Sequence, residues 1–144
     1  MTQKNGYNLG GVLYLIGKGG KKGFPFRIRL QKLVLLGKIE DSFPFSFEYE
    51  SHYYGPYSVQ LQSILVDMVT DGLINENVIA TGEENSGFIY SITEKGQLKL
   101  ANLSLSETET KKLDNLWIRY MNKSTDYIIK KAKEISGIKS ISDK

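Results

Sequence analysis

The chain has 144 residues, of which 40% are hydrophobic and 24% charged. This composition is typical of a soluble globular protein, and the length favours a single domain with a real core. Cysteine is absent, which excludes disulfides and thiolate metal sites and favours a cytoplasmic protein. The sequence MTQKNGYNLGG lacks the apolar stretch of a signal peptide, and no apolar run is long enough to span a bilayer, so we expect no membrane association.

Two helices and a strand are predicted in the first part of the chain. Residues 7–16 (YNLGGVLYLI) form a short apolar helix, followed by a flexible loop, GKGGKKG, at 17–23. Aliphatic side chains recur on one face of residues 26–39, which predicts a second helix. Between residues 43 and 54, Phe and Tyr alternate with Ser and Glu, a pattern typical of a strand.

A third helix and a hairpin are predicted from YGPYSVQLQSILVDMVTDGLI and the residues after it. Ser58 is a good N-cap, aliphatic residues follow at helical spacing, and Gly72 is placed to end the helix, which therefore spans 58–71. Two short strands, 73–80 and 87–92, flank TGEENSG, whose Gly and Asn residues suit a hairpin turn.

The remaining sequence predicts three more helices. Thr93 caps the first, TEKGQLKLANL. Ser106 and Glu109 have the spacing of a capping box at the start of a longer one. The last helix begins at Ser124 or Thr125.

This order of elements is that of a winged helix-turn-helix domain. We therefore predict an α+β, mainly helical fold: a winged helix-turn-helix with a two-stranded wing and additional C-terminal helices. The winged-helix domain would occupy residues 1–104, a C-terminal helical extension 105–138, and a frayed tail 139–144.

Three stretches carry a family resemblance. IRLQKLVLL, YGPYSVQLQSILVDMVTDGLI and YSITEKGQLKLA together resemble winged-helix proteins of the PadR and MarR type, over about residues 9–103. The closer resemblance is to the YwgA-like archaeal and bacterial branch, and the more distant one to the Panacea antitoxin domain. The resemblance implies a DNA-binding regulator that dimerises through elements flanking the wing. It also implies that residues 58–71 enter the major groove and that the wing tip is at 81–87. The side chains that would then face bases are Tyr57, Ser58, Gln60, Gln62 and Ser63.

The charges are unevenly distributed along the chain. Residues 1–40 hold eight basic side chains and one acidic side chain, whereas residues 41–94 hold nine acidic side chains and no Lys or Arg. Because phosphate contacts by Lys and Arg supply most of the affinity for DNA, attraction to DNA would have to come from the first 40 residues. The candidate phosphate contacts are Lys18, Lys21, Lys22, Arg27, Arg29 and Lys32.

Two functional classes follow from these patterns. In the first, which the basic N-terminal residues favour, the protein is a transcriptional regulator that binds double-stranded DNA as a homodimer. In the second, which the cation-free middle favours, the same fold is a protein-interaction module, antitoxin-like or an adaptor, and its acidic helix and wing face docks a basic partner. We prefer the first class.

The predicted helix that begins after Ser106 carries an apolar stripe, which packs either within its own chain or in a dimer interface. The stripe consists of Leu113, Leu116, Trp117, Tyr120 and Met121.

Other candidate sites are weaker. GKGGKKG lacks the spacing of a phosphate-binding P-loop, and His52 is the only histidine, so we predict no cofactor and no metal site. Glu48 and Glu50 share one face of a predicted strand with no nucleophile nearby, and we expect no enzyme activity. Four tyrosines lie close together in the sequence and either pack in the protein, which we favour, or stack on bases. They are Tyr49, Tyr53, Tyr54 and Tyr57.

Overall fold

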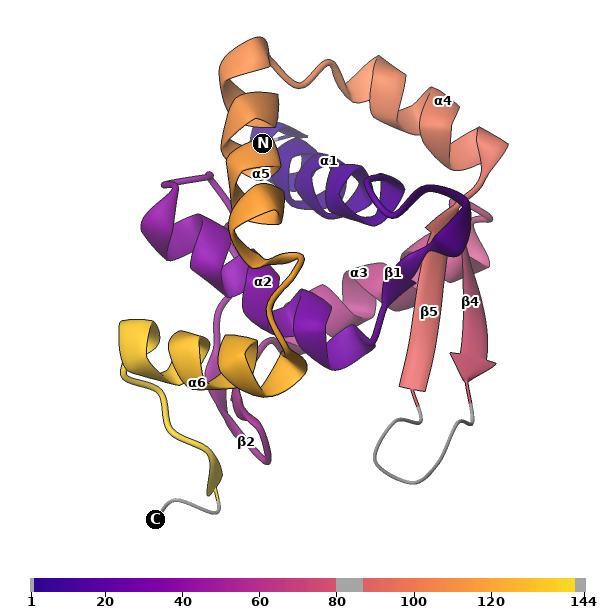
Figure 1. The fold of residues 1–144 in the computed structure, drawn as a ribbon. Coiled ribbons are helices and arrows are strands. Elements are labelled where there is room, and N and C mark those ends of the chain that lie inside the picture. Colours follow the sequence, from indigo (N-terminus) through magenta and orange to yellow (C-terminus); the bar gives the residue numbers. More distant parts are fainter. Residues whose placement is uncertain (1, 80–86, 142–144) are drawn as a thin grey trace.

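The computed structural model of the chain describes residues 2–79 and 87–141 (Figure 1). Over these residues the chain is mainly helical with small antiparallel sheets, which confirms the α+β, mainly helical part of the prediction. A short 3₁₀ turn, η1 (Gly20–Lys22), lies in the predicted glycine-rich loop. The α-helices are α1 (Thr2–Gly17), α2 (Arg27–Glu40), α3 (Val59–Thr70), α4 (Glu94–Leu103), α5 (Glu107–Tyr120) and α6 (Thr125–Ser136).

The larger sheet has the strand order β1-β5-β4, with both pairs antiparallel. Strands β4 (Ile74–Ile79) and β5 (Gly87–Ile92) form the predicted hairpin, with Ile74 opposite Ile92. The predicted wing tip was 81–87; its residues 81–86 fall outside the described residues, and Gly87 is the first residue of β5. Strand β1 (Phe24–Pro25) was not predicted, because two residues are too short to show a periodicity.

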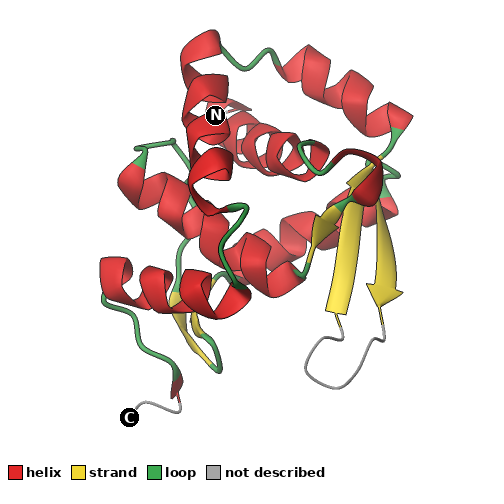
Figure 2. Cartoon of the chain, viewed as in Figure 1, coloured by secondary structure: helices red, strands yellow, loops and turns green. Residues whose placement is uncertain are grey.

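The smaller sheet is a hairpin of β2 (Glu50–His52) and β3 (Gly55–Tyr57), separate from the larger one (Figure 2). The turn before β3 requires a left-handed backbone, and Gly55 supplies it with a φ of 97°. The prediction of a strand over 43–54 is therefore wrong for residues 43–49, which have no strand partner.

Alternating burial explains the misleading pattern before β2. Phe43, Phe45 and Phe47 are buried, and their neighbours Pro44 and Glu48 are exposed. Successive rings of the three Phe residues lie 4.5 and 5.8 Å apart, centroid to centroid. The segment is an extended chain that inserts every second side chain into the core, and this gives the same period of two as a strand.

The core centres on α1, whose Val12, Leu13, Leu15 and Ile16 have no exposed surface. Gly11 lies inside this helix despite its low helix propensity, because a Cβ there would overlap the Phe45 ring. The glycine thus permits a close approach of the aromatic segment to α1. The helix is also longer than the predicted 7–16.

Side-chain caps fix where four of the helices begin. Each capping oxygen accepts a hydrogen bond from a backbone N–H three residues on, as predicted for Ser58, Thr93, Ser106 and Ser124. Ser106 and Glu109 form the complete capping box. Gly72 follows α3 with a φ of 75°, the left-handed conformation expected at its end.

The C-terminal helices share the core with the rest of the chain. Both α5 and α6 contact α2, and Leu116, Ile128 and Ala132 are buried in one cluster with α1. The predicted boundary at residue 104 therefore does not separate two cores. In the predicted tail, Ser140 is buried and accepts a hydrogen bond from Lys133 Nζ (3.0 Å). Among the described helices, none has both the length and the apolar character needed to cross a membrane.

Candidate functional site

The start of α3 is fixed to α2 by a pair of buried hydrogen bonds. Gln31 Nε2 donates to the Ser58 carbonyl oxygen (2.9 Å), and Ser58 N–H donates to Gln31 Oε1 (2.8 Å). Ser58 Oγ accepts from Leu61 N–H (3.1 Å) and so caps the helix. This arrangement sets the position of α3 relative to α2 through one side chain.

One side of α3 is open to solvent and carries no cation. Leu61, Leu65 and Met68 are buried on the opposite side. We define the α3 face as Val59, Ser63, Val66, Asp67 and Thr70, which are exposed and recur at helical spacing. The two valines are more than half exposed (57% and 53%), and no Lys or Arg occurs anywhere in residues 41–94.

The residues predicted to face bases differ in exposure. Ser58 is fully buried and its hydroxyl caps the helix, so this side chain has no surface to offer to a base. Tyr57 is half-buried and stacks on His52, with ring centroids 4.4 Å apart. Gln62 is half-buried, and its Oε1 has no hydrogen-bond partner among the described residues. Gln60 and Ser63 are exposed, although Gln60 Oε1 already accepts from Glu48 N–H (2.7 Å).

Lys18, a candidate phosphate contact, is paired within the chain. Its Nζ lies 2.9 Å from Asp114 Oδ1, which also accepts a hydrogen bond from Tyr14 (2.7 Å). Although partial burial of Asp114 opposes ionisation, the bonds from Lys18 and Tyr14 lower the pKa of this carboxyl. Lys18 therefore joins the end of α1 to α5.

Arg27, another candidate phosphate contact, holds the β4–β5 hairpin against α2. Its Nε donates to the Tyr90 hydroxyl (2.9 Å), and its Nη2 lies 3.3 Å from Glu76 Oε2. The Tyr90 hydroxyl in turn donates to Glu76 Oε2 (2.8 Å). The guanidinium also lies 4.0 Å from the centroid of the Phe88 ring. Burial is the main reason that the pKa of Tyr90 rises to about 12.

Arg29 and Lys32 are also withdrawn from solvent. Arg29 Nη1 donates to the Lys123 carbonyl oxygen (2.9 Å) and to Thr125 Oγ1 (3.1 Å), across the junction of α5 and α6. Lys32 has only 2% of its surface exposed, and desolvation lowers its pKa to about 8. Lys32, predicted as a phosphate contact, therefore has almost no surface to offer to a phosphate.

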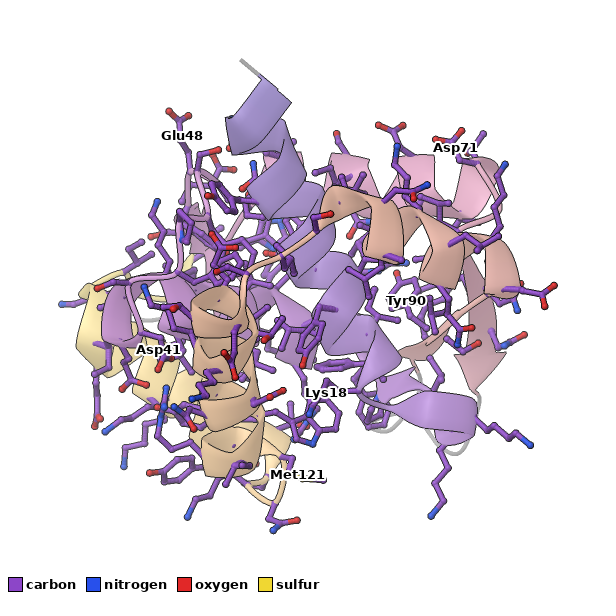
Figure 3. All side chains as sticks on the ribbon, turned by 90° about the horizontal axis from the view of Figure 1, so that it is seen from above. Lys18, Asp41, Glu48, Asp71, Tyr90 and Met121 are labelled. Carbon is purple, nitrogen blue, oxygen red and sulfur yellow. The ribbon has the colours of Figure 1, made fainter. Side chains whose placement is uncertain are left out.

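Lys21 and Lys22 are the candidate cations that remain exposed, and neither forms an ion pair within the described ranges. They belong to η1, just after Lys18. In Figure 3, Glu48 and Asp71 lie near the two ends of α3 on one side of the molecule, and Lys18 lies toward the opposite side. Lys18 and the carboxylates of Glu48 and Asp71 therefore lie on different sides of the molecule in this view.

Most of the predicted dimer stripe is core. Leu113 and Leu116 have no exposed surface and Tyr120 has 3%, so these three side chains pack within their own chain, which is the first of the two alternatives. Leu116 packs where a Cβ on Gly37 would be, which brings α5 close to α2. Trp117 is half-buried beside Phe24, and Met121 is exposed.

The four tyrosines of the predicted cluster also differ in how far they are exposed. Tyr49 is largely buried, and desolvation raises the pKa of its hydroxyl. Tyr53 and Tyr54 are exposed (68% and 60%) at the turn between β2 and β3. The favoured packing role therefore fits Tyr49 and Tyr57, and two of the tyrosines remain at the surface.

A cavity of about 480 Å³ was not predicted from the sequence. Its wall is built from the end of α1, η1, β1, α2, β5, the end of α5, and α6, and it includes Phe24 and Trp117. Because these segments are far apart in the sequence, no local motif indicates the cavity. The presence of the only tryptophan of the chain in its wall makes it observable in solution.

No family model matches the chain. The chain is similar to the uncharacterized protein YwgA of Bacillus subtilis (strain 168), with 32% identity over 88 residues. The match covers 59% of this chain and 50% of that protein, so the chain spans half the length of the curated relative it matches. The name of that relative assigns no activity.

Proposed function

We propose that the chain is a winged-helix domain of the YwgA-like branch that acts as a protein-interaction module through its α3 face. The β1-β5-β4 strand order and the packing of α3 on α2 support the winged-helix assignment. The similarity to YwgA supports the choice of branch. Fold alone does not identify a function, so the choice between partners rests on the α3 face.

The observation that carries the proposal is the composition of the α3 face. Val59 and Val66 are exposed apolar side chains on a helix that carries no cation of its own. The cation at its end is Lys95, whose Nζ donates to the Asp71 carbonyl oxygen (2.8 Å). Duplex DNA carries one negative charge per about 1.7 Å, so the carboxylates of Asp67 and Asp71 would be repelled by it. An apolar centre with a polar rim is the usual composition of a protein interface. The carboxylates at the rim would favour a basic partner, as expected for an adaptor or an antitoxin-like protein.

A transcriptional regulator that binds DNA as a homodimer is the second candidate. The strand order favours it, since winged helices commonly place the helix equivalent to α3 in the major groove. Lys21 and Lys22 are available to phosphates, and Gln60 and Ser63 to bases. It ranks second because Lys18, Arg27 and Arg29 are engaged within the chain, and Lys32 is buried.

The test is quantitative co-purification from cells that naturally contain the protein. The wild type is compared with a double variant, Val59→Ser and Val66→Ser, which removes the apolar part of the α3 face. The matched control is Val78→Ser, which changes a valine on β4 that is more exposed (71%) than either valine of the α3 face. We expect a stoichiometric protein partner that the double variant loses and the control keeps. Equal recovery with all three proteins would contradict the proposal.

A further inference from the structure

The cavity beside Trp117 combines an apolar wall with positive charge. Phe24, Leu33, Trp117 and Ile128 provide aromatic and aliphatic surface. Lys18, Lys22 and Arg29 also line it, and no carboxylate does so among the described residues of the wall. Its volume of about 480 Å³ falls within the range of roughly 300–1,000 Å³ that is typical of small-molecule sites.

Two of the three cations in the wall lack a negative partner. Lys18 is neutralised by Asp114 at 2.9 Å. Arg29 donates to the backbone carbonyls of Lys123 and Met121 and to the hydroxyl of Thr125, all of which are neutral, so its positive charge has no counter-charge among these partners. Desolvation lowers the pKa of Arg29, as expected for a half-buried cation. Lys22 is exposed and forms no ion pair within the described part of the chain.

These features restrict the chemistry of a ligand. A neutral apolar molecule would leave Arg29 and Lys22 without a counter-charge. A sugar or a nucleotide would bring many hydroxyl groups to a wall formed mostly by Phe24, Trp117 and aliphatic side chains, where buried polar groups without partners are costly. An acid with an apolar body satisfies both the wall and the cations.

We propose that this cavity binds a small amphipathic carboxylate, with its apolar body against Trp117 and its carboxylate near Lys22 and Arg29. In Figure 3, Lys18 and Met121, which line the cavity just after the ends of α1 and α5, lie on the same side of the molecule. The site is on the side away from Asp71, so a ligand there does not compete for the α3 face. The wall includes both strands (β1 and β5) and helices (α2, α5 and α6), so an occupied cavity joins the larger sheet to the helical body.

Trp117 gives a direct readout, because it is the only tryptophan and lines the cavity. The full chain is titrated with phenylbutyrate and with octanoate while tryptophan emission is recorded. Phenylbutanol and octanol, which lack the charge, serve as matched neutral ligands. We expect a saturable change with at least one acid, and at least about tenfold weaker binding of the corresponding alcohol, since hydrogen bonds to charged groups are the stronger ones.

A pair of lysine variants tests the position of the carboxylate. Lys22→Gln should weaken binding of the acid about threefold, the effect of losing a partly exposed ion pair. Lys21→Gln removes the same charge from the adjacent residue of η1, which does not line the cavity, and should leave the affinity unchanged. Both side chains are exposed, so neither change should affect folding. Equal affinity for acid and alcohol, equal effects of the two variants, or no saturable change with either acid at millimolar concentration would overturn the proposal.

Discussion

Replacing the buried Lys32 by Met should stabilise the protein, and the gain should disappear at high pH. Desolvation lowers the pKa of Lys32 from its ordinary 10.5 to about 8. At about 1.4 kcal/mol per pH unit, this corresponds to a cost of roughly 3 kcal/mol for keeping the lysine charged in the folded protein. Between the two pKa values, the unfolded chain binds more protons at Lys32 than the folded protein does. The destabilisation caused by Lys32 therefore grows as the pH falls from 10.5 to about 8, and it has its full size below pH 8.

The assay is urea unfolding of the wild type and of Lys32→Met across this pH range. We expect the variant to be more stable by up to about 3 kcal/mol at neutral pH and equal to the wild type near the ordinary lysine pKa. Taking the difference between the two proteins removes the contributions of tyrosines that titrate in the same range. Lys99→Met, at an exposed position on α4, is the control and should change stability by less than about 0.5 kcal/mol at every pH. A variant less stable than the wild type at neutral pH, or a difference independent of pH, would refute the reasoning.

Two further predictions concern packing and are also read from urea unfolding. Tyr90→Phe removes a buried hydroxyl that bonds Arg27 and Glu76, and should cost about 1.5–3 kcal/mol; a cost below about 0.5 kcal/mol would mean that these bonds do not hold the hairpin. Gly96→Ala should cost about 1–3 kcal/mol or more, because a Cβ there would overlap the Leu73 carbonyl oxygen. Gly6→Ala, with open space at its Cβ, should instead stabilise α1 by about 0.5–1 kcal/mol, and equal effects of the two substitutions would contradict this packing.

Local signals in the sequence were sufficient for the helices and their caps. The capping residues Ser58, Thr93, Ser106 and Ser124 act within three residues of their own position, and Gly72 ends α3 where its backbone preference indicates. The β4–β5 hairpin was also predictable, because its strands are close in the sequence. Caps and hairpin turns depend on residues that are close in the sequence, so they can be predicted from the sequence alone.

Features that depend on distant contacts were not predictable. Periodicity did not distinguish the buried Phe43–Phe45–Phe47 segment from a strand, because both bury every second side chain. The count of charges along the sequence predicted that Arg27 and Lys32 are surface cations. In the structure, Arg27 pairs with Glu76, which is 49 residues away in the sequence, and Lys32 is buried. The exposed fraction of a charged side chain depends on tertiary packing, which composition does not encode.

The burial and internal pairing of the basic residues also change the salt dependence that we expect for DNA binding. Of the six candidate phosphate contacts, Lys21 and Lys22 remain exposed without an ion pair in the described residues. Neutralising both should therefore flatten the slope of log affinity against log salt by at most about 1.8, at roughly 0.9 per phosphate contact. A larger change would mean that other cations of the first 40 residues leave their partners on binding DNA.

The most direct test of how α3 is used is a titration of labelled genomic duplex fragments with the wild type and with a variant carrying Gln60→Ala and Ser63→Ala, two exposed residues of this helix. These are the exposed members of the predicted base-facing set, and a good base contact contributes about 1–3 kcal/mol. If the α3 face binds protein, the affinity for every fragment at low salt should be the same for both proteins within about twofold. A preferred fragment that the variant binds about tenfold or more weakly would contradict the account and identify α3 as a DNA-reading helix.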